Sequence, residues 1–224
     1  MNLTVLGFPH SPFCIAIEKL LGSLGLSYTS QTIPAWDRSE ILRLTDGRAY
    51  EVPLLVHEGA AIFESSADSQ DIAGYLDRHF ADGRLLPDSL RGLHEIVLRY
   101  LEHEVEDKTF RLFDPFYIES ISDVAVRGML IRHKERKFGR DCVDRWRRDR
   151  GKLMTEAERL LRPLDVMVQH TGAYLFGHEP VYADFLLSGI LGNVTFSGFN
   201  EIPPVLTALC DFQARLGSFR FDLH

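Results

Sequence analysis

The chain has 224 residues, 45% of them hydrophobic and 25% charged, a balance typical of a folded globular protein and not of a disordered one. Cys14, Cys142 and Cys210 lie far apart, which argues against a disulfide framework or a zinc ribbon and favours a reducing, cytoplasmic setting. No apolar run approaches the ~18 residues of a membrane span, and the start lacks the pattern of a signal peptide. The net charge of −7 argues against general binding to nucleic acid.

One basic segment departs from this acidic balance. Residues 127–152 hold eleven Lys or Arg residues and four acidic residues, a net charge of +7 within a chain of net charge −7. Such a segment can bind an anionic partner, or it can be a solvated helical face that pairs with acidic neighbours.

The first eighty residues alternate short apolar strands with amphipathic helices. Ser11 suits the N-cap of the first helix and Pro12 its first turn. The expected elements are a strand over 3–6, a helix over 12–24, a strand over 27–33, a short helix over 38–44, strands over 52–56 and 60–63, and a helix that begins at Asp68 or Ser69 and reaches residue 80. This βαβαββα order predicts a mixed sheet covered by helices.

From about residue 90 onward, only helical periods occur. Two apolar stripes predict buried helical faces, the first made of Leu93, Ile96, Val97, Tyr100, Leu101 and Val105, the second of Leu153, Ala157, Leu160, Leu161, Leu164 and Val168. Residues 184–196 are apolar on nearly every side and predict a central, buried helix. The stretch 81–88, with Asp82-Gly83 and Pro87, is the expected linker between two domains.

The first candidate site is the segment Ser11-Pro12-Phe13-Cys14, which follows the first strand and opens the first helix. The unpaired N–H groups and the dipole of a helix N-terminus favour an anion there. The Ser11 hydroxyl can donate a hydrogen bond to the sulfur of a bound thiol, or it can serve only as an N-cap. Cys14 lies on the apolar face of the helix, which favours a buried cysteine over a reactive one.

Two further candidates come from later turns. Pro53 has no N–H to donate to a strand ladder, so Val52-Pro53 fits the start of a strand or a special turn. Asp68-Ser69 precedes a helix, where the hydroxyl can bind a carboxylate and the acid an ammonium group, or both can act as an ordinary cap. Glu64-Ser65 is a second acid-serine pair, but only Asp68-Ser69 keeps the spacing to Ile72 discussed next.

Taken together, these features resemble the cytosolic glutathione transferase superfamily. The resemblance covers nearly the whole chain. Ser11-Pro12 looks like the family's serine-type catalytic turn and Val52-Pro53 like its cis-proline. The remaining matches are Asp68-Ser69 with Ile72 and Tyr75-Leu76, then Tyr174 to Gly177, Pro180 and Ala183-Asp184 at the start of the family's central helix. The chain departs from the family pattern at Glu51, where a lysine is frequent, and at Val181, where Ser or Thr is expected.

The resemblance implies an α/β thioredoxin-like N-terminal domain over residues 1–80, a linker over 81–88, and an all-α helical-bundle domain over 89–224. Ser11 is then the catalytic residue that stabilises the thiolate of reduced glutathione. Glutathione would contact Phe13, Arg38, Val52, Pro53, Asp68 and Ser69. A small apolar electrophile or a peroxide would lie against His10, Phe110, Phe113 and Tyr117, although the spacing of these aromatic residues also fits simple packing between helices.

The same reading predicts a cytoplasmic homodimer with no metal, because the nine histidines show no metal-ligand spacing. It places the basic segment 127–152 outside every ligand-site motif, which favours an anionic partner over a part in the chemistry. Two alternative functions stay open. One is a non-catalytic interaction protein that keeps the fold but has lost glutathione binding, and the other is a glutathione-dependent thiol reductase that uses Cys14.

Overall fold

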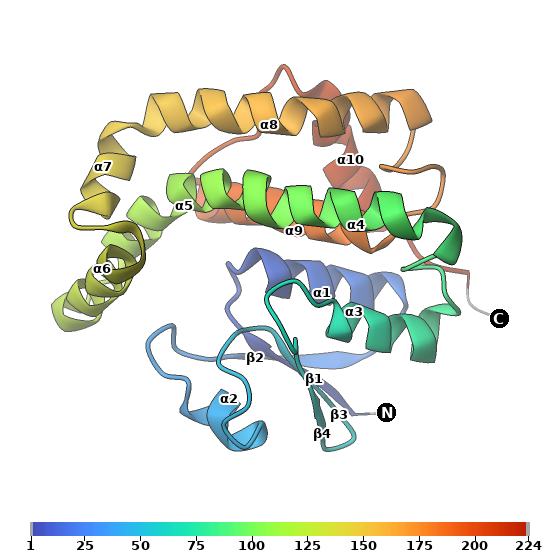
Figure 1. The fold of residues 1–224 in the computed structure, drawn as a ribbon, viewed down its shortest axis with the longest axis horizontal. Helices are drawn as coiled ribbons and strands as arrows, with labels where there is room; N and C mark the ends of the chain where they lie inside the picture. Colours follow the sequence, from blue (N-terminus) through green and yellow to red (C-terminus); the bar gives the residue numbers. More distant parts are fainter. Residues whose placement is uncertain (1, 223–224) are drawn as a thin grey trace.

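A computed structural model describes residues 2–222 of the chain (Figure 1). Its N-terminal part contains one four-stranded sheet with the strand order β2-β1-β3-β4. The strands are β1 (Leu3–Gly7), β2 (Tyr28–Thr32), β3 (Leu54–His57) and β4 (Ala60–Ile62). β1 pairs parallel with β2 and antiparallel with β3, and β3 pairs antiparallel with β4. The sheet is therefore mixed, as predicted.

Three helices accompany the sheet: α1 (Pro12–Ser23), α2 (Ser39–Leu44) and α3 (Asp71–Leu76), the last continuing into a π-helical turn, η1 (Asp77–Ala81). Ser11 is the N-cap of α1 and Pro12 occupies its first turn, which confirms both predictions. α3 begins later than expected. Neither Asp68 nor Ser69 caps it, because the carboxylate of Glu64 accepts the first N–H groups of this helix instead.

All regular structure in the rest of the described chain is helical, which confirms the predicted fold class of a thioredoxin-like part followed by helices. The helices are a short η2 (Asp88–Leu90), α4 (Arg91–Arg99), a π-helical η3 (Tyr100–Val105), α5 (Glu106–Ser120), α6 (Val124–Phe138), α7 (Cys142–Arg148), α8 (Arg150–Thr171), α9 (Tyr182–Val194), a short η4 (Phe196–Gly198) and α10 (Thr207–Ser218). No helix within residues 2–222 is long and apolar enough to cross a membrane.

α9 is the buried helix at the centre of the molecule, and it packs against α1 of the sheet half (Figure 1). The predicted central helix is thus confirmed, shifted by two residues toward the N-terminus. The two helices meet at Gly189, where a Cβ atom would lie 2.1 Å from the carbonyl oxygen of Pro12. Only glycine allows this approach, and it fixes the first turn of α1 against the helical half.

The predicted stripe on α8 is buried throughout, whereas the predicted stripe on α4 is partly wrong. Leu93 and Ile96 are exposed, with 60% and 66% of their surface accessible. The face of α4 that turns inward carries His94 and Leu98. His94 is buried, and its Nε2 accepts the N–H of Ala183 at 2.9 Å, although the two residues are 89 positions apart in the sequence. This contact orients α4 so that Leu93 and Ile96 of the apolar stripe face solvent.

Candidate functional site

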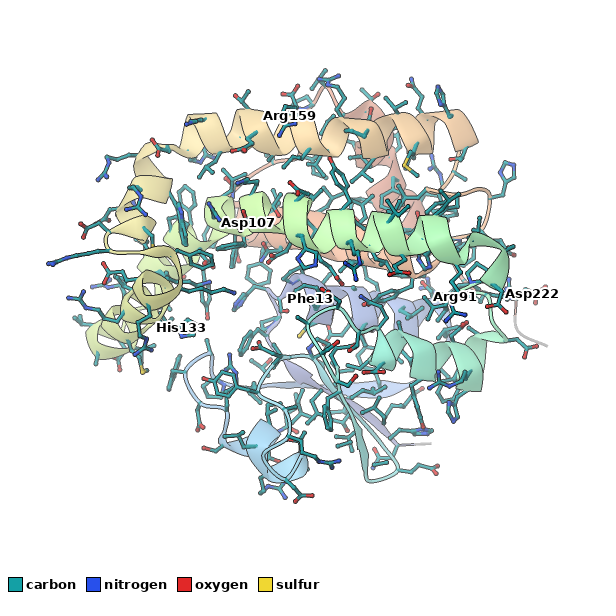
Figure 2. The ribbon with its side chains drawn as sticks, in the orientation of Figure 1. Phe13, Arg91, Asp107, His133, Arg159 and Asp222 are labelled. Atoms are coloured by element: carbon teal, nitrogen blue, oxygen red, sulfur yellow. The ribbon has the colours of Figure 1, made fainter. Side chains whose placement is uncertain are left out.

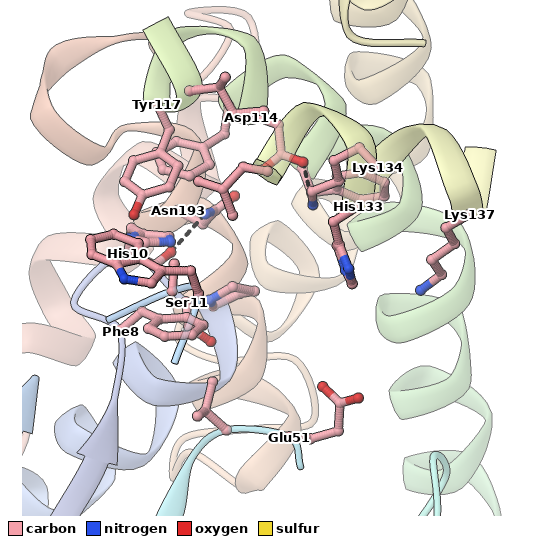
Figure 3. Close-up of a pocket in the computed structure, with 18 of the residues that line it drawn as sticks. Phe8, His10, Ser11, Glu51, Asp114, Tyr117, His133, Lys134, Lys137 and Asn193 are labelled. Carbon is pink, nitrogen blue, oxygen red and sulfur yellow. Dashed lines mark hydrogen bonds and ion pairs between the residues drawn. The ribbon is translucent and has the colours of Figure 1, made fainter. Parts of the chain in front are cut away.

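A cavity of about 490 Å³ lies between the sheet half and helices α5 and α6 (Figure 3). Phe13, at the start of α1, lies between the two halves of the molecule (Figure 2). Most of the residues predicted for the site line this cavity: His10, Ser11, Phe13, Arg38, Val52, Phe110, Phe113 and Tyr117. Chain segments from the N-terminal turn to α6 therefore converge on one space.

Ser11 is held at the N-terminus of α1 by its own turn. Its N–H donates to the carbonyl of Phe8 at 3.1 Å, and its Oγ accepts the N–H of Cys14 at 3.4 Å. In the hydrogen bonds of residues 2–222, Ser11 Oγ acts only as an acceptor, so its proton is available to a ligand. A buried hydroxyl at the N-terminus of a helix can stabilise an anion such as a thiolate, because it donates a hydrogen bond and the helix dipole is positive there.

Cys14 is too buried to take part in thiol exchange. Its Sγ packs on Gly7, where a Cβ atom would lie only 2.3 Å away, and 2% of the residue is exposed. Burial is the main cause that raises the pKa of the Cys14 thiol to about 11. Because the thiolate is the reactive form, this cysteine is a packing residue and the site lacks the nucleophile that a reductase requires.

Val52 offers free main-chain groups to the cavity. The Val52-Pro53 peptide bond is cis, and β3 begins at the next residue. Within the described residues, neither the N–H nor the C=O of Val52 takes part in a hydrogen bond. Pro53 itself is buried behind Val52 and does not line the cavity. A peptide-like ligand could pair with Val52 as a further strand would.

Arg38 lines the cavity and lies over an aromatic ring. Its guanidinium lies over Phe8, 4.4 Å from the ring centroid, and donates to the carbonyls of Pro34 and Ala35 at 3.1 and 2.9 Å. Its Nε is buried and has no acceptor among the described residues. The remaining capacity for hydrogen bonds suits a carboxylate at this position.

Packed aromatic rings form a second wall of the cavity. His10 packs on Phe113 and Tyr117 of α5, with ring centroids 5.2 and 4.0 Å apart, and on Phe8 at 5.4 Å. Burial, aided by the nearby charge of Lys134, lowers the pKa of His10 to about 4, so the imidazole is neutral at neutral pH. The wall is therefore apolar and uncharged.

Asp68 and Ser69 do not reach the cavity. Ser69 Oγ donates to the Glu64 carboxylate at 2.8 Å, and Asp68 accepts from His103 Nε2 at 2.9 Å and pairs with Arg99 at 3.7 Å. Glu64 also accepts the N–H of Asp71 at 2.6 Å. The groups predicted to hold the amino-acid end of a ligand thus bind partners within the chain.

The basic segment is closer to the site than the sequence suggested. Lys134, Arg136 and Lys137 of α6 line the same cavity as Ser11. Residues 127–152 lie outside the ligand-site motifs of the sequence, as predicted, but these three residues line the cavity that those motifs form. The reason is the short turn after α5, closed by Asp123 as the N-cap of α6, which brings α6 alongside α5.

Two acidic residues of the site were missed. Glu106 and Asp114 line the cavity from α5, and Asp114 pairs with Lys134. Burial raises the pKa of both carboxyl groups, that of Glu106 to about 7. Both lie on the helical face that carries Phe110 and Tyr117, at spacings of three, four or seven residues, so extending that stripe would have found them.

Comparisons with known proteins agree with this geometry. Residues 5–85 match the family model for the glutathione S-transferase N-terminal domain. Glutaredoxin 2 from Salmonella typhimurium, solved in complex with glutathione, is 23% identical over 96% of this chain and 94% of that protein, with a TM-score of 0.72. The family match covers the sheet-containing part of the chain, and the described residues as a whole have the glutathione transferase fold.

Two fungal glutathione transferases share this fold. The glutathione transferase GSTFuA3 from Phanerochaete chrysosporium is 15% identical over 99% of this chain and 98% of that one, with a TM-score of 0.79. A glutathione S-transferase of Ceriporiopsis subvermispora, solved in complex with glutathione, is 16% identical over 98% and 99%, with a TM-score of 0.74. No curated protein matches the sequence.

Proposed function

We propose that this chain is a serine-type glutathione transferase that binds reduced glutathione beside Ser11 and activates its thiol. The observation that carries the proposal is the position of Ser11, whose free hydroxyl proton lies at the N-terminus of a 12-residue helix and at the cavity. The Val52 main chain would pair with the cysteinyl residue of the tripeptide, and Arg38 would hold its glycine carboxylate.

The required shift in thiol acidity is within reach of these groups. A free thiol has a pKa near ~8.5, and lowering it by ~2 units needs about 2.7 kcal/mol. A hydrogen bond from Ser11 to the thiolate supplies about 1.5–3 kcal/mol, and the N-terminus of α1 adds about 0.3–1 kcal/mol. Together, these two contributions reach the value of about 2.7 kcal/mol that the shift in the thiol pKa needs.

The reaction needs no covalent bond to the enzyme. The thiol of glutathione loses its proton to solvent, and the Ser11 hydroxyl donates a hydrogen bond to the resulting thiolate. A sulfur lone pair then forms a bond to the electrophilic carbon, and the leaving group departs with the electron pair of the bond that breaks. The aromatic wall of His10, Phe113 and Tyr117 supports an electrophile with an apolar body.

A homodimer is part of the proposal. Leu93 and Ile96 are large apolar side chains that α4 exposes to solvent next to each other. A second copy of the chain would cover them. The three unpaired cysteines support a cytoplasmic setting.

One observation favours a second candidate, a non-catalytic interaction protein with the same fold. Glu64 and Arg99 engage Ser69 and Asp68, so the amino-acid end of glutathione would have to displace partners within the chain. The thiol reductase has no such support, because Cys14 is buried.

Calorimetric titration with reduced glutathione separates these candidates. The transferase predicts saturable binding that weakens in Arg38→Gln, whereas the matched surface variant Arg43→Gln, which removes a charge from the exposed Arg43–Glu40 pair, keeps the wild-type affinity. Absence of binding at millimolar glutathione would overturn the transferase and favour the interaction protein.

A further inference from the structure

A row of cations on α6 faces the cavity, and the proposed thiol chemistry does not use it. The residues of α6 that line the cavity are Met129, Leu130, His133, Lys134, Arg136, Lys137 and Phe138. They recur every three or four positions, so one continuous face of the helix forms this wall. Figure 3 shows the side chains of His133 and Lys137 directed from α6 toward the space that Glu51 faces from the other side.

The cations of this wall differ in their partners. Lys134 pairs with the buried Asp114. Arg132, on the same helix but outside the cavity, pairs with Glu135 at 2.5 Å. Within residues 2–222, Arg136 and Lys137 make no ion pair with a carboxylate, whereas Arg147 of α7 pairs with Glu119 and Asp144. Two exposed cations therefore face the cavity without a counterion from the chain.

The acidic residues of the cavity leave this charge uncompensated. Asp114 is neutralised by Lys134. Burial is the main cause that raises the pKa of Glu106 to about 7, so near neutral pH this side chain carries about half a charge. Glu51 is the remaining acid, exposed on the far side. Arg38, with its buried Nε lacking an acceptor, adds a further positive charge to the cavity.

Aromatic surface adjoins these charges. The Nζ of Lys134 lies 5.0 Å from the ring centroid of Phe110, and Tyr117 and Trp36 also line the cavity. A ligand that contacts both the aromatic residues and the cations of α6 has a flat apolar body and a negative charge. A carboxylate suits the guanidinium of Arg136, which can donate two parallel hydrogen bonds to it.

We propose that the second substrate of this cavity is an aromatic carboxylate whose ring lies on Phe113 and Tyr117 of α5 and whose carboxylate is bound by Arg136 and Lys137. This inference rests on the proposed transferase function and deepens it, since it replaces an uncharged electrophile with an anionic one. It also gives the cations of α6 a part in specificity, as residues that bind the substrate away from the reacting carbon.

The test compares a chlorodinitrobenzoate with its methyl ester as electrophiles for the wild type and for Arg136→Gln/Lys137→Gln. In both reactions the glutathione sulfur displaces chloride from the ring, so only the carboxylate differs. We expect the KM for the benzoate to rise about tenfold or more in the double variant, the size of a lost charge-assisted contact. The KM values for the ester and for glutathione should change by less than about twofold. Arg132→Gln, which removes a charge from the same helix outside the cavity, should match the wild type.

Either of two kinetic outcomes would overturn this inference. An equal rise in KM for benzoate and ester would mean that the variant disturbs the cavity generally. A rise in the KM for glutathione alone would mean that these cations bind its glycine carboxylate. If the wild type conjugates neither probe, the proposed function fails separately. The anion site is then tested by calorimetry with unreactive dinitrobenzoate, and equal affinity for the wild type and the double variant would overturn it.

Discussion

The side-chain amide of Asn193 donates a hydrogen bond of 2.7 Å to the main-chain carbonyl of His10, which joins α9 to the residue that precedes Ser11. Asn193 is buried and lies one turn after Gly189, where α9 touches Pro12. The central helix α9 thus contacts the residue before Ser11 and the residue after it. The position of the Ser11 hydroxyl depends on the helical half of the molecule as well as on its own N-cap.

Asn193→Ala should therefore destabilise the protein and weaken the site. Loss of the amide leaves the His10 carbonyl without its donor, and we expect the free energy of unfolding to fall by about 1–3 kcal/mol in denaturant titration. Glutathione affinity should fall with it. Thr195→Ala, at the end of the same helix, removes only a bond to Leu191 within the helix and should cost less than about 0.5 kcal/mol. Equal losses in the two variants would contradict this role of Asn193.

The affinity of the cavity for anions should depend on pH through Glu106. Its folded-state pKa of about 7 means that the carboxyl is neutral below pH 7 and negative above it. Dinitrobenzoate, ionised throughout, should therefore bind more weakly as the pH rises from about 6 to 8, by up to about tenfold. The charged groups that also affect the pKa of Glu106 are Lys134 and Lys137 of α6, which lower it, and Asp107 and Asp114 of α5, which raise it.

Glu106→Gln should remove this dependence. Calorimetry without glutathione avoids interference from its thiol. Burial is the main cause that lowers the pKa of His133, the other titratable residue of this wall, and the comparison with Glu106→Gln separates the two groups. A pH dependence that persists unchanged in Glu106→Gln would show that another group is responsible.

The exposed pair on α4 should hold two copies of the chain together. We expect the wild type to sediment as a dimer and Leu93→Asp/Ile96→Asp as a folded monomer, because two charges would be buried without partners in the interface. Val166→Asp is the matched control, since this apolar residue of α8 is also exposed, at 40%. Sedimentation of the wild type as a monomer, or of the double variant as a dimer, would rule out this interface.

The three cysteines should differ strongly in how fast they are alkylated in the folded protein. Cys210 is exposed, whereas Cys14 and Cys142 are buried. Because the pKa of Cys14 is raised to about 11, alkylation of the folded protein near pH 8 should label Cys210 first and leave Cys14 unmodified, as read by mass spectrometry of peptides. Denatured protein provides the control, with all three sites labelled. Rapid labelling of Cys14 in the folded state would instead favour the function of a thiol reductase that uses Cys14.

The sequence predicts what is set by local chemistry. Ser11 and Pro12 specify the start of α1 without help from the rest of the chain, because a cap and a first-turn proline act over three residues. The apolar run that became α9 is equally local. The order of such elements predicted a mixed sheet followed by helices, and the resemblance to glutathione transferases supplied the thioredoxin-like fold.

The errors arise where distant contacts decide. His94 rotates α4 through its bond to Ala183, and Glu64 caps α3 from seven residues before its first residue. Neither contact leaves a periodic signal. The contribution of α6 to the cavity likewise depends on the packing of α6 along α5. The net charge of residues 127–152 carries no information about this packing.

The central claim is that Ser11 stabilises the thiolate of bound glutathione, and the pH dependence of thiolate absorbance tests it most directly. In the binary complex with saturating glutathione, the wild type should show a thiol pKa about 2 units below that of free glutathione. Ser11→Ala should raise it by about 1–2 units while glutathione still binds. Ser218→Ala, at the exposed end of α10, should leave it unchanged. A thiol pKa that is the same in the wild type and in Ser11→Ala, with glutathione bound to both, would contradict the account.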